Sequence, residues 1–258
     1  MKLKNFIIIA LISVSTPVMA QYTRFVTQGT IVYEKRVNTY AIIKKQIALS
    51  KEDTWGKMAF ENYQKNNPQF KTLKSTLIFN NEKSLFVPEE EATQSGGWFN
   101  LPQTQQNNTV LSSLNLGTST IQKKIYEENY TVADSIRKIN WKITDEFRNI
   151  AGYNCRRANA LVMDSVYVVA FYTDEIAVSG GPETFSGLPG MILGVALPHD
   201  NITWFATSVT DTPIAESKLA LTPKKGKTVS NKQLFDILKS ALKSWGTWAN
   251  ETFKWAMM

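Results

Sequence analysis

The feature that most constrains the fold is a segment rich in glycine and proline, which separates two apolar stretches that contain many β-branched residues. It begins with Gly181 and Pro182 and ends with Pro189 and Gly190. Glycine allows backbone conformations that other residues avoid, whereas proline fixes φ and removes a hydrogen-bond donor. We therefore predict a shaped connection between two β-strands. Such a connection either borders a binding site or only carries the chain across the edge of a sheet.

The start of the chain has the pattern of a secretory signal peptide. Residues 1–5 include two lysines, residues 6–14 are mostly apolar, and small residues lead to Ala20. This order predicts export and cleavage after Ala20. The apolar run is shorter than the roughly 20 residues that a transmembrane helix needs. We expect a protein that does not span the membrane and that is periplasmic, associated with the outer membrane, or secreted.

Residues 21–258 are enough for one domain with a sizeable core. The net charge of +7 is spread along the chain, and the densest basic cluster is Lys224, Lys225 and Lys227. Binding of nucleic acid would favour basic and aromatic residues interleaved on one face. An exported protein also rarely meets nucleic acid, so we do not expect a nucleic-acid partner.

Cysteine and histidine are scarce in this chain. Cys155 is the one cysteine, so an internal disulfide is impossible and the core must hold through burial. His199 is the one histidine. Zinc sites usually recruit several Cys or His ligands, so a conventional zinc site is not expected. We predict no metal and no cofactor.

Alternating apolar and polar residues predict β-strands along much of the chain. The predicted strands cover residues 26–37, 71–79, 83–87, 131–136, 140–147, 156–163, 166–173, 191–197 and 202–209. Short turns between successive strands favour an antiparallel arrangement. Residues 88–120 contain glutamates, a glycine pair and a polar tract, and we predict a long loop there.

Two helices are predicted beside the strands. Apolar residues such as Trp55 recur at helical spacing within residues 50–67, which indicates a shorter helix near the N-terminus. Ser230 and Gln233 have the spacing of a capping box, and one apolar face follows over residues 234–249. We therefore predict one α+β domain, in which a curved, mainly antiparallel sheet cradles a C-terminal amphipathic helix.

Three blocks in the second half of the chain resemble the GLPGLI family of exported Bacteroidetes proteins. The motif core at residues 187–192 reads GLPGMI, with Met191 in place of the usual Leu. The upstream block reads WKITDE at residues 141–146 and continues to Cys155, and the middle block reads AFYTDEI at residues 170–176. The resemblance implies export and a single sheet-rich domain, and it carries no established reaction.

One alternative function is that of a hydrolase or peptidase that uses Cys155 or paired carboxylates. A thiolate nucleophile needs a base within hydrogen-bond reach and a third, orienting group, which His199 and Asp200 would have to supply. Cys155 lies in a strand-like context without a helix N-terminus that would lower its pKa. A buried structural cysteine is the simpler interpretation, and we assign no catalytic residue.

Two acidic pairs, at residues 145–146 and 174–175, are either functional or structural. Paired carboxylates can act on a glycosidic bond or hold calcium, but these pairs lack a recognisable loop spacing. We interpret them as structural charges, and we predict that Glu146 or Glu175 pairs with an arginine across neighbouring strands and fixes the register. The candidate partners are Arg148, Arg156 and Arg157.

The preferred function is non-enzymatic binding at the rim of the sheet. The glycine- and proline-rich segment is flanked by four aromatic residues, Trp141, Tyr153, Tyr172 and Phe185, which either pack in the core or line an apolar groove. We predict that this rim binds an apolar or peptide-like ligand, or a membrane-protein partner in the envelope. Its candidate contacts within the segment are Gly181, Pro182, Phe185, Gly187, Leu188, Pro189 and Gly190. A passive structural component of the envelope is the second alternative.

Overall fold

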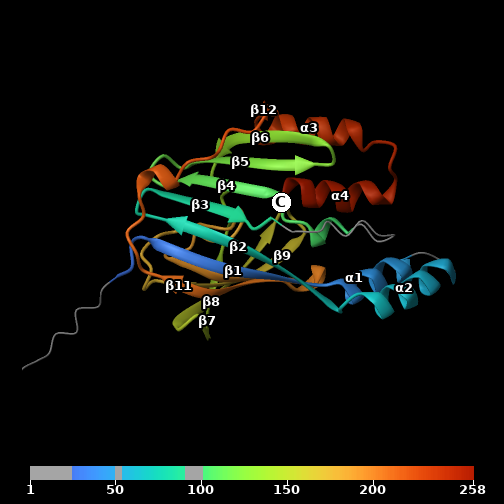
Figure 1. The fold of residues 1–258 in the computed structure, drawn as a ribbon, viewed down its shortest axis with the longest axis horizontal. Helices are drawn as coiled ribbons and strands as arrows, with labels where there is room; N and C mark the ends of the chain where they lie inside the picture. Colours follow the sequence, from blue (N-terminus) through green and yellow to red (C-terminus); the bar gives the residue numbers. More distant parts are fainter. Residues whose placement is uncertain (1–24, 50–53, 91–100) are drawn as a thin grey trace, which may run out of the picture.

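The computed structural model describes residues 25–49, 54–90 and 101–258 (Figure 1). The predicted signal peptide lies outside the described residues. Within them, twelve strands form a single open, curved sheet. Neighbouring strands are antiparallel, except that β12 runs parallel to β6. The predicted curved and mainly antiparallel sheet is therefore confirmed.

Most strands that are consecutive in the chain are also neighbours in the sheet. Their bounds are β1 Gly29–Asn38, β2 Phe70–Phe79, β3 Lys83–Pro88, β4 Asn108–Ser113, β5 Thr118–Ile125, β6 Glu128–Ser135, β7 Lys142–Ile150, β8 Tyr153–Val162, β9 Val166–Thr173, β10 Met191–Leu197, β11 Ile202–Thr210 and β12 Lys227–Val229. The order across the sheet is β12-β6-β5-β4-β3-β2-β1-β11-β10-β9-β8-β7.

Alternate residues of the strands form the core, as the period of two requires. In β1, Ile31, Tyr33, Lys35 and Val37 are buried, whereas the residues that alternate with them are partly covered or exposed. The buried side of β1 continues onto its neighbours, because Tyr33 pairs with Ser75 of β2 and with Ala206 of β11. This face carries the core and the cavities described below.

Helices attach at two places on the sheet (Figure 1). The described helices are α1 Thr39–Leu49, α2 Thr54–Asn66, α3 Asn231–Ala241 and α4 Thr247–Met257, together with the short 3-10 helices η2 Pro102–Thr104, η3 Pro198–Asp200 and η4 Glu216–Lys218. Helices α1 and α2 lie beside each other and project from the sheet, whereas α3 lies beside β6. Among the described residues, no helix combines the length and apolar character that crossing a membrane requires.

Helix α3 begins with the predicted capping box. The Ser230 hydroxyl accepts from the Gln233 backbone N–H at 3.2 Å, and the Gln233 side chain accepts from the Ser230 N–H at 2.8 Å. Leu234 and Leu238 then enter the same core cluster as Val132 of β6. The apolar stripe of α3 is therefore packed on the sheet.

The C-terminal region differs from the predicted single helix, because α3 and α4 are separate. Gly246 lies between them with a φ of +57°, outside the helical range. The N-terminal region also differs, since α1 precedes the predicted helix. Ile42 and Ile43 in α1 are β-branched and favour strands locally, but both are buried by tertiary packing. Trp55 of α2 is 78% exposed, so it does not lie on a buried apolar face as its spacing predicts.

The structure also differs from the predicted long loop over residues 88–120. Strands β4 and β5 pair there as a hairpin, with Gly117 in a left-handed conformation at φ +64° in the turn. Ser112 and Ser119 face each other across this hairpin on the core side of the sheet. Because these inward positions are polar, residues 108–125 lack the alternation of apolar and polar residues that predicts strands. Residues 91–100 lie outside the described part of the chain.

Candidate ligand-binding cavity

The segment from Gly181 to Gly190 lies in the connection from β9 to β10, and it shares a cavity with Ser84 of β3, Ser112 of β4 and Ser119 of β5 on the core face of the sheet. Two of its glycines are required by close approach. A Cβ added at Gly190, which has a φ of +145°, would lie 2.1 Å from the Thr173 carbonyl oxygen. One added at Gly181 would lie 2.6 Å from the Phe185 carbonyl oxygen. The glycines therefore let this segment fold tightly against β9 and against itself.

Three of the four predicted aromatic residues come together beneath this segment. The Trp141 Nε1–H donates to the Ser186 carbonyl at 2.9 Å, and the Phe185 ring meets Trp204 edge-on at 6.1 Å between centroids. Tyr172 pairs with Ile192 across β9 and β10 and belongs to the same core cluster as Phe185. Tyr153 packs against the other core cluster, at the far end of β8. These rings mainly pack as core, and Phe185 is the one that borders the cavities described here.

The other residues of the segment divide between core and surface. Gly181, Pro182, Leu188 and Gly190 are buried, whereas Gly187 and Pro189 are exposed. A Cβ on Gly187 would lie 3.7 Å from Trp141 Nε1, so the exposed turn sits directly on this ring. The segment is therefore anchored in the core through Leu188 and Phe185, and its exposed residues are Gly187 and Pro189.

A large cavity lies on the core face of the sheet, beside Glu183 and Phe185. Its volume is about 750 Å³, within the ~300–1,000 Å³ typical of small-molecule sites. Its walls come from the sheet, η2, the β5–β6 turn and α4. The aromatic residues in these walls are Phe185, Tyr126, Trp204, Trp245 and Trp255, and the charged residues away from the exposed rim are Lys35, Lys123 and Glu183.

The two lysines are held by backbone carbonyl groups. Lys35 is 3% exposed, donates to the Gln105 carbonyl at 2.8 Å, and lies 5.0 Å from the centre of the Trp204 ring. Lys123 is 5% exposed and donates to the Ala256 carbonyl of α4 at 2.8 Å. Burial lowers the pKa of Lys123 to about 8, with a smaller contribution from the charge of Arg137.

Glu183 brings the opposite charge to this site. It has a left-handed backbone with φ +53°, which is unusual for a residue other than glycine. The Asn108 Nδ2–H donates to its Oε2 at 3.0 Å. Burial raises the pKa of Glu183, while the charges of Lys35 and Lys123 and the Asn108 hydrogen bond oppose that rise. The strained turn therefore places a partly buried carboxyl group within electrostatic reach of two buried ammonium groups.

Three side chains in the cavity wall have a buried polar atom without a hydrogen-bond partner among the described residues. These atoms are Gln103 Oε1, Trp204 Nε1 and Trp255 Nε1. Buried polar groups are normally paired, and an unpaired one costs about 1–3 kcal/mol. Orphaned groups in the wall of a cavity are groups that a polar ligand could satisfy.

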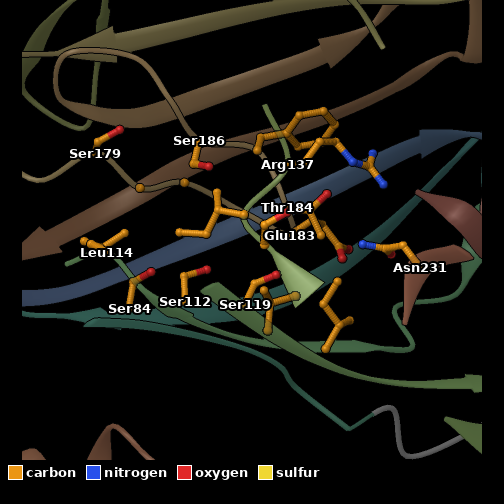
Figure 2. Close-up of a pocket in the computed structure, with 17 residues that line it drawn as sticks. Ser84, Ser112, Leu114, Ser119, Arg137, Ser179, Glu183, Thr184, Ser186 and Asn231 are labelled. Atoms are coloured by element: carbon orange, nitrogen blue, oxygen red, sulfur yellow. The ribbon is translucent and has the colours of Figure 1, made fainter. Parts of the chain in front are cut away.

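A second, small cavity lies behind the segment, and seven of the seventeen residues that line it carry hydroxyl groups. Figure 2 shows Ser84, Ser112 and Ser119 in a row on neighbouring strands, with Ser186 of the segment facing them. The volume is about 30 Å³, comparable to that of one water molecule. Glu183 and Phe185 border both cavities. The turn that contains them is therefore the wall between a polar pocket and the larger aromatic one.

The end of α4 closes one side of this region. Lys123 donates to the Ala256 carbonyl at 2.8 Å, and Arg137 Nη2 donates to the Met257 carbonyl at 2.6 Å. Cationic donors suit the C-terminal carbonyls of a helix, where the macrodipole is negative. Lys254 also forms an ion pair with Asp200 of η3. The buried Lys123 and the partly buried Arg137 thus tie α4 to the rest of the domain at the site.

The residues of the hydrolase alternative are not brought together. Cys155 is fully buried near the start of β8, and burial together with the Glu175 charge raises its pKa to about 12. His199 is exposed, with its ring 6.1 Å from Tyr167. Tyr167 pairs with Leu161, six residues along β8 from Cys155. At ~3.3 Å per residue, Leu161 lies roughly 20 Å along β8 from Cys155, so the His199 ring is near the opposite end of the strand from the thiol.

The predicted charge pairs gather at an irregularity of the β7–β8 hairpin. The register shifts between Ile143 and Phe147, and Arg157 Nη1 reaches Glu146 Oε2 there at 2.6 Å. Arg156 Nη2 instead reaches Asp145 Oδ1 at 2.7 Å. The other two predicted residues act differently. The Arg148 guanidinium lies 4.6 Å from the centre of the Phe205 ring, and Glu175 accepts from the Asn154 N–H at 3.3 Å.

Sequence reasoning missed Lys35, Lys123 and Glu183. Lys35 had a visible signal, since it alternates in phase with Ile31, Tyr33 and Val37 and must therefore face the core. In the part of the chain that the structure describes, no group of three or more His, Cys, Asp or Glu residues could hold a metal ion. The site therefore offers ammonium, carboxyl, amide and aromatic groups.

Comparison with known proteins gives a short family match and a likeness of fold. A family model described as "Protein of unknown function (Porph_ging)" matches residues 161–194, which include the GLPGMI core. The solved structure of PNGF-II in space group C2 has a TM-score of 0.52 at 16% identity, covering 82% of this chain and 32% of that one. The structure of PNGF-II in P21 gives 0.51 at 18% identity, covering 82% and 33%.

This chain therefore spans about a third of PNGF-II, and at this identity the likeness concerns the fold alone. No match was found among curated proteins.

Proposed function

We propose that this protein is an exported binding protein without catalysis of its own, and that an apolar or peptide-like ligand occupies the large cavity beside Glu183 and Phe185. The observation that carries the proposal is the cavity itself, with a volume of about 750 Å³ and walls rich in indole and phenyl rings. Ligand sites are typically concave and mostly apolar, with a few placed polar groups.

The polar groups of the cavity support a ligand that has some hydrogen-bonding capacity. Trp204 is 2% exposed, yet its Nε1 has no partner among the described residues. Gln103 Oε1 is an unpartnered acceptor in the same wall. A ligand with one acceptor and one donor, such as a peptide group, would satisfy both atoms.

Export and family membership belong to the same proposal. The pattern of residues 1–20 supports export into an envelope compartment or the medium. The GLPGMI core, which lies inside the matched residues 161–194, supports membership of the GLPGLI family. The turn at Gly187 and Pro189 is the exposed part of this motif and is the surface that we assign to an envelope or outer-membrane partner.

The proposal is tested by titrating the purified protein with N-phenyl-1-naphthylamine, a neutral apolar fluorophore. We expect saturable binding, and we expect Trp255→Leu to weaken it about tenfold, because a large aromatic wall is lost. Trp55→Leu is the matched control, since Trp55 is also on a helix and is 78% exposed outside the cavity. Competition by decanol or by the peptide acetyl-Leu-Phe-Leu-amide then separates apolar from peptide-like ligands.

Two results would overturn the proposal. One is the absence of saturable fluorophore binding by the wild-type protein. The other is equal affinity of wild type, Trp255→Leu and Trp55→Leu, which would place the fluorophore outside the cavity. Melting curves of both variants identify any loss of fluorophore binding that comes from unfolding.

A further inference from the structure

We infer that the end of the molecule where the large cavity opens docks on the surface of a lipid bilayer that contains anionic lipids. The docking surface consists of exposed apolar side chains on two pairs of helices, α1 with α2 and α3 with α4, and of the lysines around them. The inference goes beyond the proposed function, because it concerns the outside of the protein and assigns a partner to it.

The mouth of the cavity is marked by two aromatic residues that line it and are also exposed. Tyr126 lies in the turn between β5 and β6 and is 56% exposed, and Trp245 lies between α3 and α4 and is 45% exposed. Their rings are 5.4 Å apart between centroids. Because the same side chains line the cavity and meet the solvent, the cavity reaches the surface at this point.

The tip of the α1–α2 pair carries a second group of exposed apolar side chains. Tyr40, near the start of α1, packs against Tyr63, near the end of α2, at 6.3 Å between ring centroids, so the two helices are antiparallel. The end of α1 and the start of α2 therefore form the tip of the pair. Its exposed apolar residues are Leu49 and Trp55, both 78% exposed, and Met58, which is 60% exposed.

Both groups of apolar side chains lie at the same end of the sheet. Figure 1 shows the α1–α2 pair and the connection between α3 and α4 on the side where β5 ends. Gln46, about one turn before Leu49 in α1, lines the same cavity as Tyr126 and Trp245. The cavity therefore borders both groups, and one extended surface that faces this end can contact them together.

The side chains of this end suit the interface of a bilayer. Trp and Tyr concentrate at the depth of the lipid headgroups, where one part of the ring is in an apolar environment and the other part is wet. Single exposed apolar residues are normal on a protein surface, but a group of them beside a cavity indicates an interaction site. A bilayer is also the phase in which an apolar ligand accumulates, so docking would shorten its route to the cavity.

The charge of this end favours an anionic surface. The four helices together contain seven lysines and three acidic residues. Lys243, between α3 and α4, adds an exposed positive charge, whereas residues 50–53 contain one lysine and two acidic residues. The exposed Lys124 and Glu127 beside Tyr126 balance each other, and Met258 is buried at the other end of α4. The excess of lysines strengthens binding to a negatively charged leaflet.

The test measures binding of the protein to lipid vesicles by flotation in a density gradient. The protein is purified after export and its intact mass is measured, because an uncleaved apolar leader would itself bind lipid. One vesicle sample is phosphatidylcholine alone, and the other contains three parts of phosphatidylcholine and one part of the anionic phosphatidylglycerol. We expect about tenfold tighter binding to the anionic vesicles, and loss of this preference in 1 M NaCl, because salt screens the attraction.

Three variants locate the docking surface. Leu49→Ser, Trp55→Ser and Trp245→Ser should each weaken binding to the anionic vesicles about fivefold, since each removes an apolar side chain from the interface. Leu116→Ser is the matched control for Leu49→Ser. Leu116 is 73% exposed in the turn between β4 and β5, at the far end of these strands from Tyr126, so this variant should bind as the wild type does.

The inference is overturned if the wild type does not bind the anionic vesicles, if it binds both kinds of vesicle equally, or if Leu116→Ser weakens binding as much as Leu49→Ser. Dimers of the wild type in light scattering that Leu49→Ser dissociates, without vesicle binding, would assign this end to a contact between copies of the chain and also overturn it. Fluorophore binding in the cavity is measured without vesicles, so none of these results affects the proposed function. Melting curves identify any variant that fails to fold.

Discussion

The Thr184 hydroxyl donates to the main-chain oxygen of Met258 at 3.1 Å and joins the segment from Gly181 to Gly190 to the C-cap of α4. This bond spans 74 positions of sequence and lies beside Glu183, which borders both cavities. Lys123 of β5 and Arg137, which follows β6, also donate to the end of α4. The Thr184 bond adds the segment to the groups that hold this helix. Substitutions in the segment should therefore change the local stability of α4.

The first prediction concerns this bond. Thr184→Val keeps the shape of the side chain and removes the donor, so it should lower the free energy of unfolding by about 1 kcal/mol. In Thr184→Val, the amides of α4 should exchange faster than in the wild type, and this increase should be larger than that for the amides of α3. Ser165→Ala, in an exposed turn, is the control and should change stability by less than about 0.5 kcal/mol. Unchanged exchange in α4 would show that the bond does not hold the helix.

The second prediction concerns the backbone of the segment. Gly190→Ala places a Cβ 2.1 Å from the Thr173 carbonyl oxygen, so the start of β10 must move away from β9. We expect a loss of more than about 3 kcal/mol in urea unfolding, because strain and a lost strand contact add. Gly117→Ala is the matched control. Its φ is +64° and nothing lies within 4 Å, so it should cost about 1–2 kcal/mol. Equal losses for both would contradict the close approach.

Much of the sheet was predictable because its strands bury alternate apolar residues. Strand β1 shows this pattern through Ile31, Tyr33 and Val37. The pattern did not predict β4 and β5, because Ser112 and Ser119 occupy inward positions beside the small cavity. The alternation of apolar and polar residues predicts a strand that faces an apolar core, and it fails where the inward side chains are polar.

The site was less predictable than the sheet. The segment around Glu183 was identified from its glycines and prolines, but a glutamate in such a connection resembles a surface residue. The surroundings of Glu183 include α4. The position of this helix is fixed by Lys123 of β5 and by Arg137, which follows β6. Contacts between such distant positions carry no periodic signal in a single sequence.

The third prediction concerns the charge pair at the β7–β8 irregularity. Glu146→Gln removes the partner of Arg157, whose Nη1 lies 2.6 Å from the glutamate oxygen. Both side chains are partly exposed, so the loss should be only about 0.2–1 kcal/mol. A double-mutant cycle with Arg157→Met measures the coupling, and 1 M NaCl should weaken it. A coupling of zero, or no change in melting temperature for Glu146→Gln, would remove the proposed role in the register.

The fourth prediction concerns pH. Burial lowers the pKa of Lys123 from 10.5 to about 8, so the unfolded chain binds more protons between these values. The stabilising contribution is therefore complete above pH 10.5 and is lost as the pH falls through 8, with a size of a few kcal/mol at most. We expect the free energy of unfolding of the wild type to rise relative to that of Lys123→Met between pH 8 and 10.5.

The comparison with Lys123→Met is needed because Cys155 titrates with the opposite sign. Burial raises its pKa from 9 to about 12, so its contribution is lost as the pH rises through that range. The difference between wild type and variant cancels this contribution. Lys124→Met, an exposed neighbour, should keep the wild-type profile. A parallel pair of profiles for wild type and Lys123→Met would contradict the burial of a charged Lys123.

The fifth prediction concerns the reactivity of Cys155, which separates a binding protein from a thiol hydrolase. The thiolate is the reactive form, and both its burial and a pKa of about 12 suppress it in the folded protein. We expect the disulfide reagent DTNB at pH 8 to label Cys155 only as the protein unfolds, so the rate should rise with urea along the unfolding curve. An exposed cysteine made by Ser165→Cys in a Cys155→Ala background should react within seconds under the same conditions. Labelling of native Cys155 at that rate would show an accessible thiolate, which a buried cysteine in β8 cannot provide, and would restore the hydrolase alternative.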